Sequence, residues 1–318
     1  MSFYTIQYKI AVNLELSEPL EIKRSEKFIE KIVLETVQEN SKTFLLITFF
    51  IPKEAYENCK YEDIPTFLDI QQEERDKFFD PQQGFKLLAG SERIKINLAT
   101  KEHIEAIKRH ILLDKVAQLK NWILNFLFFH FEISPVEMTR ITTDIPEKFI
   151  VYSPVCVSSN QWAHLLSESM LEGIKLEIFK EQLQIRSMSS IYAFFYDVHK
   201  NTELDSVSKF VIFYGMLQEI LEALYGEIDQ KKTDDFIVKH LGCQRNYHRI
   251  VRRIKIPVTA ITYYRNEVAH PVSLGNINQE FRNVITDLTL DLEKLIRQAG
   301  LELSIHHREL YATLYSTI

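Results

Sequence analysis

Arg265 and His270 are the two residues of this 318-residue sequence whose types and spacing best suit catalysis. Asn266 follows the arginine directly and Pro271 follows the histidine, inside a stretch that begins at Ile261. A histidine titrates near neutral pH, and an arginine carries a permanent positive charge. Because the preceding part of the chain holds no comparable polar constellation, we expect any chemistry of this protein to lie in this stretch.

An Arg-x4-His pair alone is a weak signal. A chain of this composition contains about 0.4 such pairs by chance, and about 0.02 when an asparagine must follow the arginine. The position of the pair adds weight, because the stretch lies near the end of the penultimate long helix that the sequence predicts.

Helix geometry separates the two side chains. On a straight helix with about 100° per residue, Arg265 points about 140° away from His270, whose face holds Tyr263, Asn266 and Glu267. Pro271 disfavours the α conformation of the histidine before it, so we expect the helix to end there and the imidazole to be free to turn. Alternatively, a two-fold dimer could supply the arginine and the histidine from facing helices.

The pattern Arg265-Asn266-x-x-Ala269-His270 at the end of a helix resembles the HEPN superfamily, and most closely the Apea-like HEPN domains of bacterial defence proteins. The resemblance covers residues 183–318, and residues 1–182 resemble no family that we recognise. It implies a homodimer and a metal-independent endoribonuclease without a cofactor, in which an RNA 2′-hydroxyl attacks the adjacent phosphate. It assigns proton transfer to His270, stabilisation of phosphoryl charge to Arg265, and orientation of the histidine or the phosphate to Asn266.

Two other interpretations of the same residues stay open. Some HEPN domains are non-catalytic modules that dimerise or bind a ligand or partner. An arginine and a histidine near a helix C-terminus also interact favourably with the helix dipole and the last carbonyls, as they would in an unrelated helical domain. Under the catalytic interpretation, the resemblance implies a defence or toxin role, with a protein or phage-derived trigger acting on residues 1–182.

A basic segment lies just upstream of this stretch, and we expect it to bind RNA. The sequence predicts a helix from Tyr247 to Lys255, on which arginines at i, i+4, i+7 and i+8 spacing form one positive face. Tyr264, together with Tyr247 and Tyr263, could stack on bases. The predicted RNA-binding residues are Arg245, Arg249, Arg252, Arg253 and Tyr264. The alternative is a solvated helix face that pairs with Glu219, Glu222 or Asp234.

Composition limits the class of protein. Hydrophobic residues make up 46% of the chain and charged residues 26%, which suits packed domains, and the net charge of −6 argues against a surface that coats nucleic acid all over. The three cysteines show no zinc-site spacing, His306-His307 has no carboxylate at ligand spacing, and no glycine-rich nucleotide motif is present. We therefore expect no metal and no cofactor. Without a signal peptide or a membrane-length apolar run, we expect a cytoplasmic protein that does not contact membranes.

The first 182 residues predict an α+β domain with an antiparallel sheet beside a long helix. Residues 5–16 alternate as a strand, and residues 32–38 and 43–51 predict a hairpin whose second strand is central. A helix follows Thr100 as N-cap, and its apolar end, residues 123–131, fits either a helix or a strand. Residues 147–157 predict another strand. We expect this domain to sense a signal, inhibit the second domain or bind a partner.

Residues 183–318 predict an all-α, up-and-down bundle. A short helix that carries Leu165 and Leu166 is expected at the junction. The apolar periodicity and the caps then predict helices over residues 184–200, 205–226, 233–242, 247–255, 258–270 and 278–298, the last of them ending before Gly300.

Overall fold

The computed structural model describes residues 2–58, 79–80, 84–89, 92–95, 101–131, 135–145, 150–151, 164–166 and 188–315, apart from residues 13, 17, 27, 252 and 270–277. By its internal contacts the chain divides into two compact units. The first comprises Met1–Leu127 and Ile133–Gln184, and the second comprises Phe128–Glu132 and Ile185–Ile318. The units are therefore described separately.

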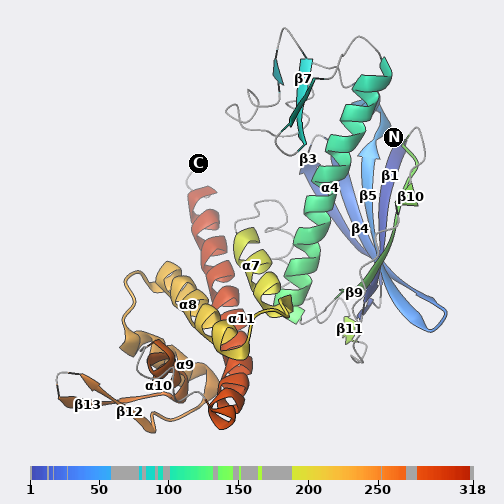
Figure 1. The fold of residues 1–318 in the computed structure, drawn as a ribbon. Coiled ribbons are helices and arrows are strands. Elements are labelled where there is room, and N and C mark those ends of the chain that lie inside the picture. The colour runs from blue at the N-terminus through green and yellow to red at the C-terminus, as the bar shows by residue number, and fades with distance from the viewer. Residues whose placement is uncertain are drawn as a thin grey trace. The chain divides into compact units, whose positions relative to one another are not determined.

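A six-stranded antiparallel sheet forms the centre of the first unit (Figure 1). Its strands follow the order β10-β9-β1-β5-β4-β3. They are β1 (Phe3–Val12), β3 (Leu20–Glu26), β4 (Ile29–Glu39), β5 (Lys42–Pro52), β9 (Pro135–Thr143) and β10 (Ile150–Val151). The alternation predicted for the first strand is confirmed, because Ile6, Tyr8 and Ile10 are buried while Gln7 and Lys9 are partly exposed. The sequence did not predict β3 and β9.

The predicted hairpin between β4 and β5 is confirmed. Glu39 pairs with Lys42, and the two residues between them, Asn40 and Ser41, both have positive φ, at 50° and 63°. Two left-handed central residues match the right-handed twist of the flanking strands. This turn places the apolar strand β5 between β1 and β4, at the centre of the sheet, as predicted.

Smaller elements complete the described part of the first unit. Helix α1 (Lys53–Glu57) follows β5, and β6 (Phe79–Asp80), β7 (Gly84–Ala89) and β8 (Glu92–Lys95) form a three-stranded sheet. Strand β11 (His164–Leu166) pairs in parallel with β2 (Leu14–Leu16). The helix predicted for Leu165 and Leu166 is therefore wrong, because a distant strand supplies their backbone partner. The predicted N-cap Thr100 and most of the 147–157 strand lie outside the described residues.

Helix α4 (Lys101–Phe131) is one continuous helix, so the apolar stretch 123–131 is helical and not a strand. Its buried residues Leu112, Val116, Leu119 and Ile123 follow helical spacing. The Lys120 ammonium lies 5.2 Å from the centroid of the Tyr8 ring, which brings this part of α4 onto the sheet (Figure 1). The last turn of α4, from Phe128, belongs to the second unit.

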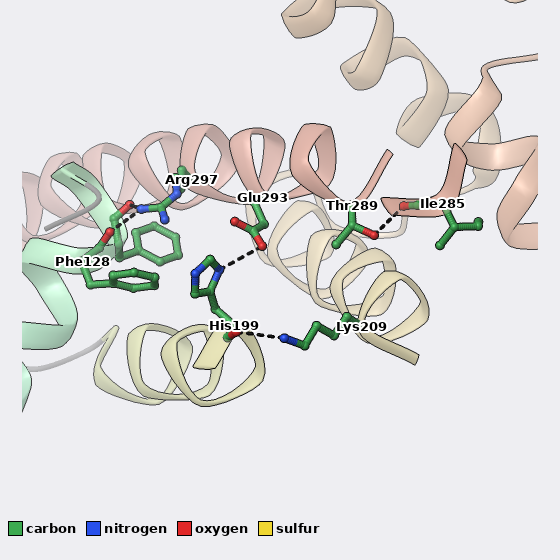
Figure 2. A network of polar contacts seen from close by, with 8 residues as sticks. Phe128, His199, Lys209, Ile285, Thr289, Glu293 and Arg297 are labelled. Atoms are coloured by element: carbon green, nitrogen blue, oxygen red, sulfur yellow. Dashed lines mark hydrogen bonds and ion pairs between the residues drawn. The ribbon is translucent and has the colours of Figure 1, made fainter. Parts of the chain in front are cut away.

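Residues of the second unit contact both the backbone and the aromatic rings of this last turn of α4. The Arg297 guanidinium donates to the carbonyl oxygens of Phe128 and Phe129 (Figure 2). These carbonyls lie in the last turn of the helix, where no helix amide follows to donate to them. The same guanidinium lies over the rings of Phe128 and Phe195. The Phe129 ring lies so close to Gly300 that a Cβ there would come within 2.6 Å of it.

The second unit is mostly helical. Its described helices are α7 (Ser189–Lys200), α8 (Ser206–Tyr225), α9 (Gln230–Leu241), α10 (Ala260–Ala269) and α11 (Gln279–Tyr315), and α8 packs along α11. Of Asp205 and Ser206, either of which the sequence allows as the N-cap of α8, Asp205 is the cap: its carboxylate accepts from the Ser208 amide at 2.8 Å, and Gly226 ends the helix with a φ of 74°, as predicted. Gly242 also closes α9 in the left-handed conformation, as predicted.

Three predictions for this unit are wrong. Helix α9 starts at Gln230, capped by Asp229, so Thr233 and Asp234 lie inside it and not at its start. Gly300 does not end the last helix, because α11 continues to Tyr315 and uses the glycine for close packing. The basic segment forms an antiparallel hairpin of β12 (Tyr247–Val251) and β13 (Ile254–Val258), so the unit is not all-α.

Candidate functional site

Helix α10, which carries Arg265, is anchored at its first turn by a buried polar chain. The Asp234 carboxylate of α9 accepts from the Thr259 hydroxyl at 2.6 Å and from the Thr259 amide at 3.3 Å. The Thr259 hydroxyl oxygen accepts in turn from the Thr262 amide at 3.3 Å, which makes Thr259 the N-cap of α10. These three residues are almost completely buried. The direction of α10 is therefore fixed by a hydrogen-bonded carboxylate in the interior.

The Arg265 side chain lies over the ring of Tyr214, a buried residue of α8. Its guanidinium carbon is 5.3 Å from the ring centroid, a distance suited to a cation–π contact. One guanidinium nitrogen donates to the Asn266 side-chain oxygen at 3.2 Å. Among the described residues, no carboxylate pairs with Arg265. The guanidinium is thus held in place while most of its donors stay uncommitted.

Polar groups from four elements meet beneath Arg265. Burial raises the pKa of Tyr214, and Asp234 acts in the same direction, while the Thr262 hydroxyl and the charges of Arg265 and Arg249 lower it. The hydroxyl oxygens of Tyr214 and Thr262 are both buried, and neither has a hydrogen-bond partner among the described residues. The Arg249 Nε, from β12, is also buried and has no hydrogen-bond partner among the described residues.

The second half of the predicted catalytic pair falls outside the described residues. The description of α10 stops at Ala269, and His270 and Pro271 belong to the segment 270–277 that it omits. The predicted helix end at His270, and the approach of His270 to Arg265 within one chain or across a dimer, both stay predictions. The structure brings Arg265 and Asn266 together and adds Tyr214, Thr262 and Arg249 to them.

The predicted basic helix is wrong because its residues alternate with a period of two. Ile250, Val251, Ile254, Ile256 and Val258 favour strands, and Pro257 occupies an edge strand where no amide is needed. Val251 pairs with Ile254 across a two-residue turn whose second residue, Arg253, has a φ of 67°. Arg249 lies in β12, Arg245 precedes this strand and Arg253 lies in the turn, so the helical spacing from which the positive face is predicted is absent.

The predicted RNA-binding residues therefore have different surroundings. Arg245 precedes the hairpin and forms an ion pair with Asp235 of α9. Arg249 lies in β12 and is partly buried, Arg253 is exposed at the turn, and Arg252 lies outside the described residues. The alternative partners Glu219, Glu222 and Asp234 form no ion pair with Arg245, Arg249 or Arg253.

Tyr264 belongs to an aromatic cluster beside Arg265. The rings of Tyr247 and Tyr263 are 5.0 Å apart and tilted by 30°, and Tyr264 contacts both of them edge-on. Phe281 of α11 contacts Tyr264 from the other side at 5.2 Å. Burial, followed by the neighbouring Tyr247 and Tyr263, raises the pKa of Tyr264. The cluster fastens the base of the hairpin to α10.

Sequence reasoning missed the residues that support Arg265. Tyr214 fits the apolar periodicity of the predicted 205–226 helix, which favours a core position, and Asp234 lies at the predicted start of the 233–242 helix. The only signal for Asp234 was its place next to the buried positions Phe236 and Ile237 of an amphipathic helix. A carboxylate on that face needs a partner, but the sequence does not say which residue provides it.

Other polar residues form no metal site among the residues that the structure describes. His199 pairs with Glu293 at 3.0 Å, contacts the Phe128 ring edge-on and stacks on the Phe195 ring, so it supports the helix packing shown in Figure 2. His306 and His307 are partly buried on α11. Within the described ranges, every helix is too short or too polar to cross a bilayer.

Comparison of the chain with protein-family models, with curated proteins and with solved structures finds no match. The functional assignment therefore depends on the residues around Arg265.

Proposed function

We propose that the helical unit is a HEPN-type endoribonuclease domain and that the chain cleaves RNA without a metal ion, with Arg265, Asn266 and His270 as its site. The observation that carries the proposal is the Arg265 guanidinium. It is held over the buried ring of Tyr214, and no carboxylate among the described residues neutralises it. A fixed arginine with uncommitted donors is suited to the negative charge that develops on phosphoryl oxygens.

In the proposed reaction, the 2′-hydroxyl oxygen attacks the adjacent phosphorus and the bond from phosphorus to the 5′-oxygen breaks. The products are a 2′,3′-cyclic phosphate and a 5′-hydroxyl end. One proton leaves the 2′-hydroxyl and one reaches the 5′-oxygen, and His270 transfers one of them. Arg265 donates to the non-bridging oxygens. The Asn266 oxygen accepts from Arg265, which leaves its amide NH2 to orient the phosphate or His270.

The direct test is cleavage of end-labelled RNA by the full chain in the presence of EDTA. We expect the wild type to produce 2′,3′-cyclic phosphate ends, and Arg265→Ala and His270→Ala to lower the rate by at least about a hundredfold. Lys294→Ala and His306→Ala are matched controls on α11 and should cleave like the wild type. Wild-type protein that leaves all RNA intact, with and without the first unit, would rule out the nuclease.

We also propose a defence or toxin role, a homodimer through the helical unit and a protein or phage-derived trigger at the first unit. Growth arrest on overexpression of the wild type, absent with His270→Ala, would support the toxic activity. Sedimentation of the purified chain measures the dimer.

The competing function is a non-catalytic HEPN-type module that dimerises or binds a ligand. Its support is the same cation–π contact, because an arginine packed on a buried tyrosine also stabilises a fold. If Arg265→Ala lowers the free energy of unfolding and no RNA is cleaved by any form of the chain, this second function is favoured.

A further inference from the structure

The β12–β13 hairpin carries positive charge that the described residues leave mostly unpaired. From Cys243 to Asn266 the sequence has no aspartate or glutamate, although the whole chain has a net charge of −6. The cations in this stretch are Arg245, Arg249, Arg252, Arg253, Lys255 and Arg265. Of those described, only Arg245 forms an ion pair. The hairpin is therefore a local positive surface that suits an anionic partner.

The hairpin also extends away from the packed core. Along β13, Val258 is buried, Ile256 is partly exposed and Ile254 is 65% exposed, so burial falls steadily toward the turn. On β12, Ile250 is 73% exposed. Figure 1 shows the two strands projecting beside α10. A projecting, positively charged pair of strands can contact an extended partner along its length, through both its backbone and its side chains.

The base of the hairpin adds an aromatic surface. Tyr247 is 37% exposed, and its ring is supported from below by Tyr263 and at its edge by Tyr264. Tyr247 and Arg249 lie two residues apart on one strand, so their side chains share a face. Tyr264 of this aromatic cluster directly precedes Arg265 on α10. The face that carries Tyr247 and Arg249 therefore ends at an aromatic cluster beside Arg265.

We propose that this face of the hairpin, together with Tyr247, Tyr263 and Tyr264, binds an unpaired RNA strand and leads it to Arg265. An aromatic ring stacks on the face of a base, and in a duplex the neighbouring base pairs cover those faces. Arg253, exposed at the turn, then contacts the phosphates. This inference rests on the proposed function for its choice of RNA, but binding is measured separately from cleavage.

The binding test uses the full-length His270→Ala chain and fluorescence anisotropy with a short, unstructured labelled RNA and its duplex form. We expect the single strand to bind more tightly than the duplex. Tyr247→Leu should weaken single-strand binding about tenfold and leave duplex binding unchanged, whereas Tyr247→Phe keeps the stacking ring and should retain affinity. Ile250→Ser is the matched control, because Ile250 lies on the opposite face of the hairpin.

The salt dependence of RNA affinity tests whether the positive charge of the hairpin contacts phosphates. Removing one phosphate contact with Arg253→Asn should lower the slope of log K against log salt by about 0.7 for a single strand. Asparagine is chosen at residue 253 because it tolerates the positive φ of 67° observed there. Lys294→Gln, an exposed lysine on α11, should leave the slope unchanged.

The outcomes separate this inference from the proposed function. Equal affinity for single strand and duplex, or equal weakening by Tyr247→Leu and Ile250→Ser, would overturn the hairpin surface even if the wild type cleaves RNA. Selective single-strand binding by a chain that never cleaves RNA would support the surface and reject the nuclease. Unchanged thermal midpoints of the variants exclude misfolding as the cause.

Discussion

Arg265 owes its position to neighbours that carry no charge of their own at neutral pH. The Tyr214 ring supports the guanidinium, Thr262 lies beside the phenol, and Thr259 links α10 to the interior through Asp234. Burial raises the pKa of Tyr214, so its hydroxyl stays protonated across the physiological range. The ring, and not the hydroxyl, therefore carries the contact with Arg265.

Two substitutions of Tyr214 distinguish the ring from the hydroxyl. Tyr214→Phe keeps the ring and removes a buried hydroxyl without a hydrogen-bond partner among the described residues, so the free energy of unfolding should stay equal or rise by up to about 1 kcal/mol. Tyr214→Leu removes the cation–π contact and aromatic packing and should cost about 1–3 kcal/mol. Urea unfolding measures both. A loss above about 1 kcal/mol for Tyr214→Phe would show that the hydroxyl has a partner in solution.

At the scale of helices and strands, sequence rules for caps and turns predict the structure correctly where contacts between neighbouring residues decide it. Helix α8 begins at Asp205, one of the two caps that the sequence allows there, and Gly226 and Gly242 end α8 and α9 as the sequence predicts, because each of these residues acts on the backbone within one turn. The β12–β13 hairpin is not predicted, because the helical spacing of the arginines coincides with β-branched residues that favour strands. Gly300 is predicted to end a helix, because nothing nearby in the sequence shows that Phe129 packs against it.

The residues of the candidate site also divide into those that local sequence predicts and those that only tertiary packing brings in. The pair Arg265 and Asn266 could be selected from residue type and spacing, whereas Tyr214, Asp234 and Arg249 come from other elements and join it only through tertiary packing. Nothing in the neighbouring sequence shows that a tyrosine at a core position or an aspartate inside a helix supports Arg265. Tertiary contacts of this kind are not encoded in periodicity.

Two helix glycines give a matched test of this packing. Gly300→Ala places a Cβ within 2.6 Å of the Phe129 ring and should destabilise the protein by about 1–3 kcal/mol, despite the better helix propensity of alanine. Gly215→Ala, inside α8, meets no atom within 4 Å and should stabilise it by about 0.5–1 kcal/mol. Chemical denaturation of the two variants measures the difference. Effects of the same sign would contradict the close approach of Phe129 and Gly300.

For the whole molecule, the division into two units does not follow a single cut in the sequence. The predicted boundary at residue 182 lies next to the observed division at Gln184, but Phe128–Glu132 also belongs to the second unit. These residues supply the Phe128 and Phe129 rings and the carbonyls that Arg297 contacts. A fragment of residues 183–318 thus lacks part of its own core.

We therefore expect the 183–318 fragment to unfold at a lower temperature than the same unit in the full chain, and to aggregate through the apolar surface around Phe195. A peptide of residues 120–132 added in trans should raise the midpoint, since burial of each phenylalanine contributes about 3–5 kcal/mol to packing. The same peptide with Phe128→Ala and Phe129→Ala is the control and should have no effect. Differential scanning fluorimetry measures all three. A fragment as stable alone as with the peptide would mean that the last turn of α4 is dispensable for the second unit.

The same result decides how the first unit is removed in the activity tests. If the fragment is stable alone, deletion of residues 1–182 is a fair test of the toxic activity. If it is not, the deleted chain must retain residues 128–132.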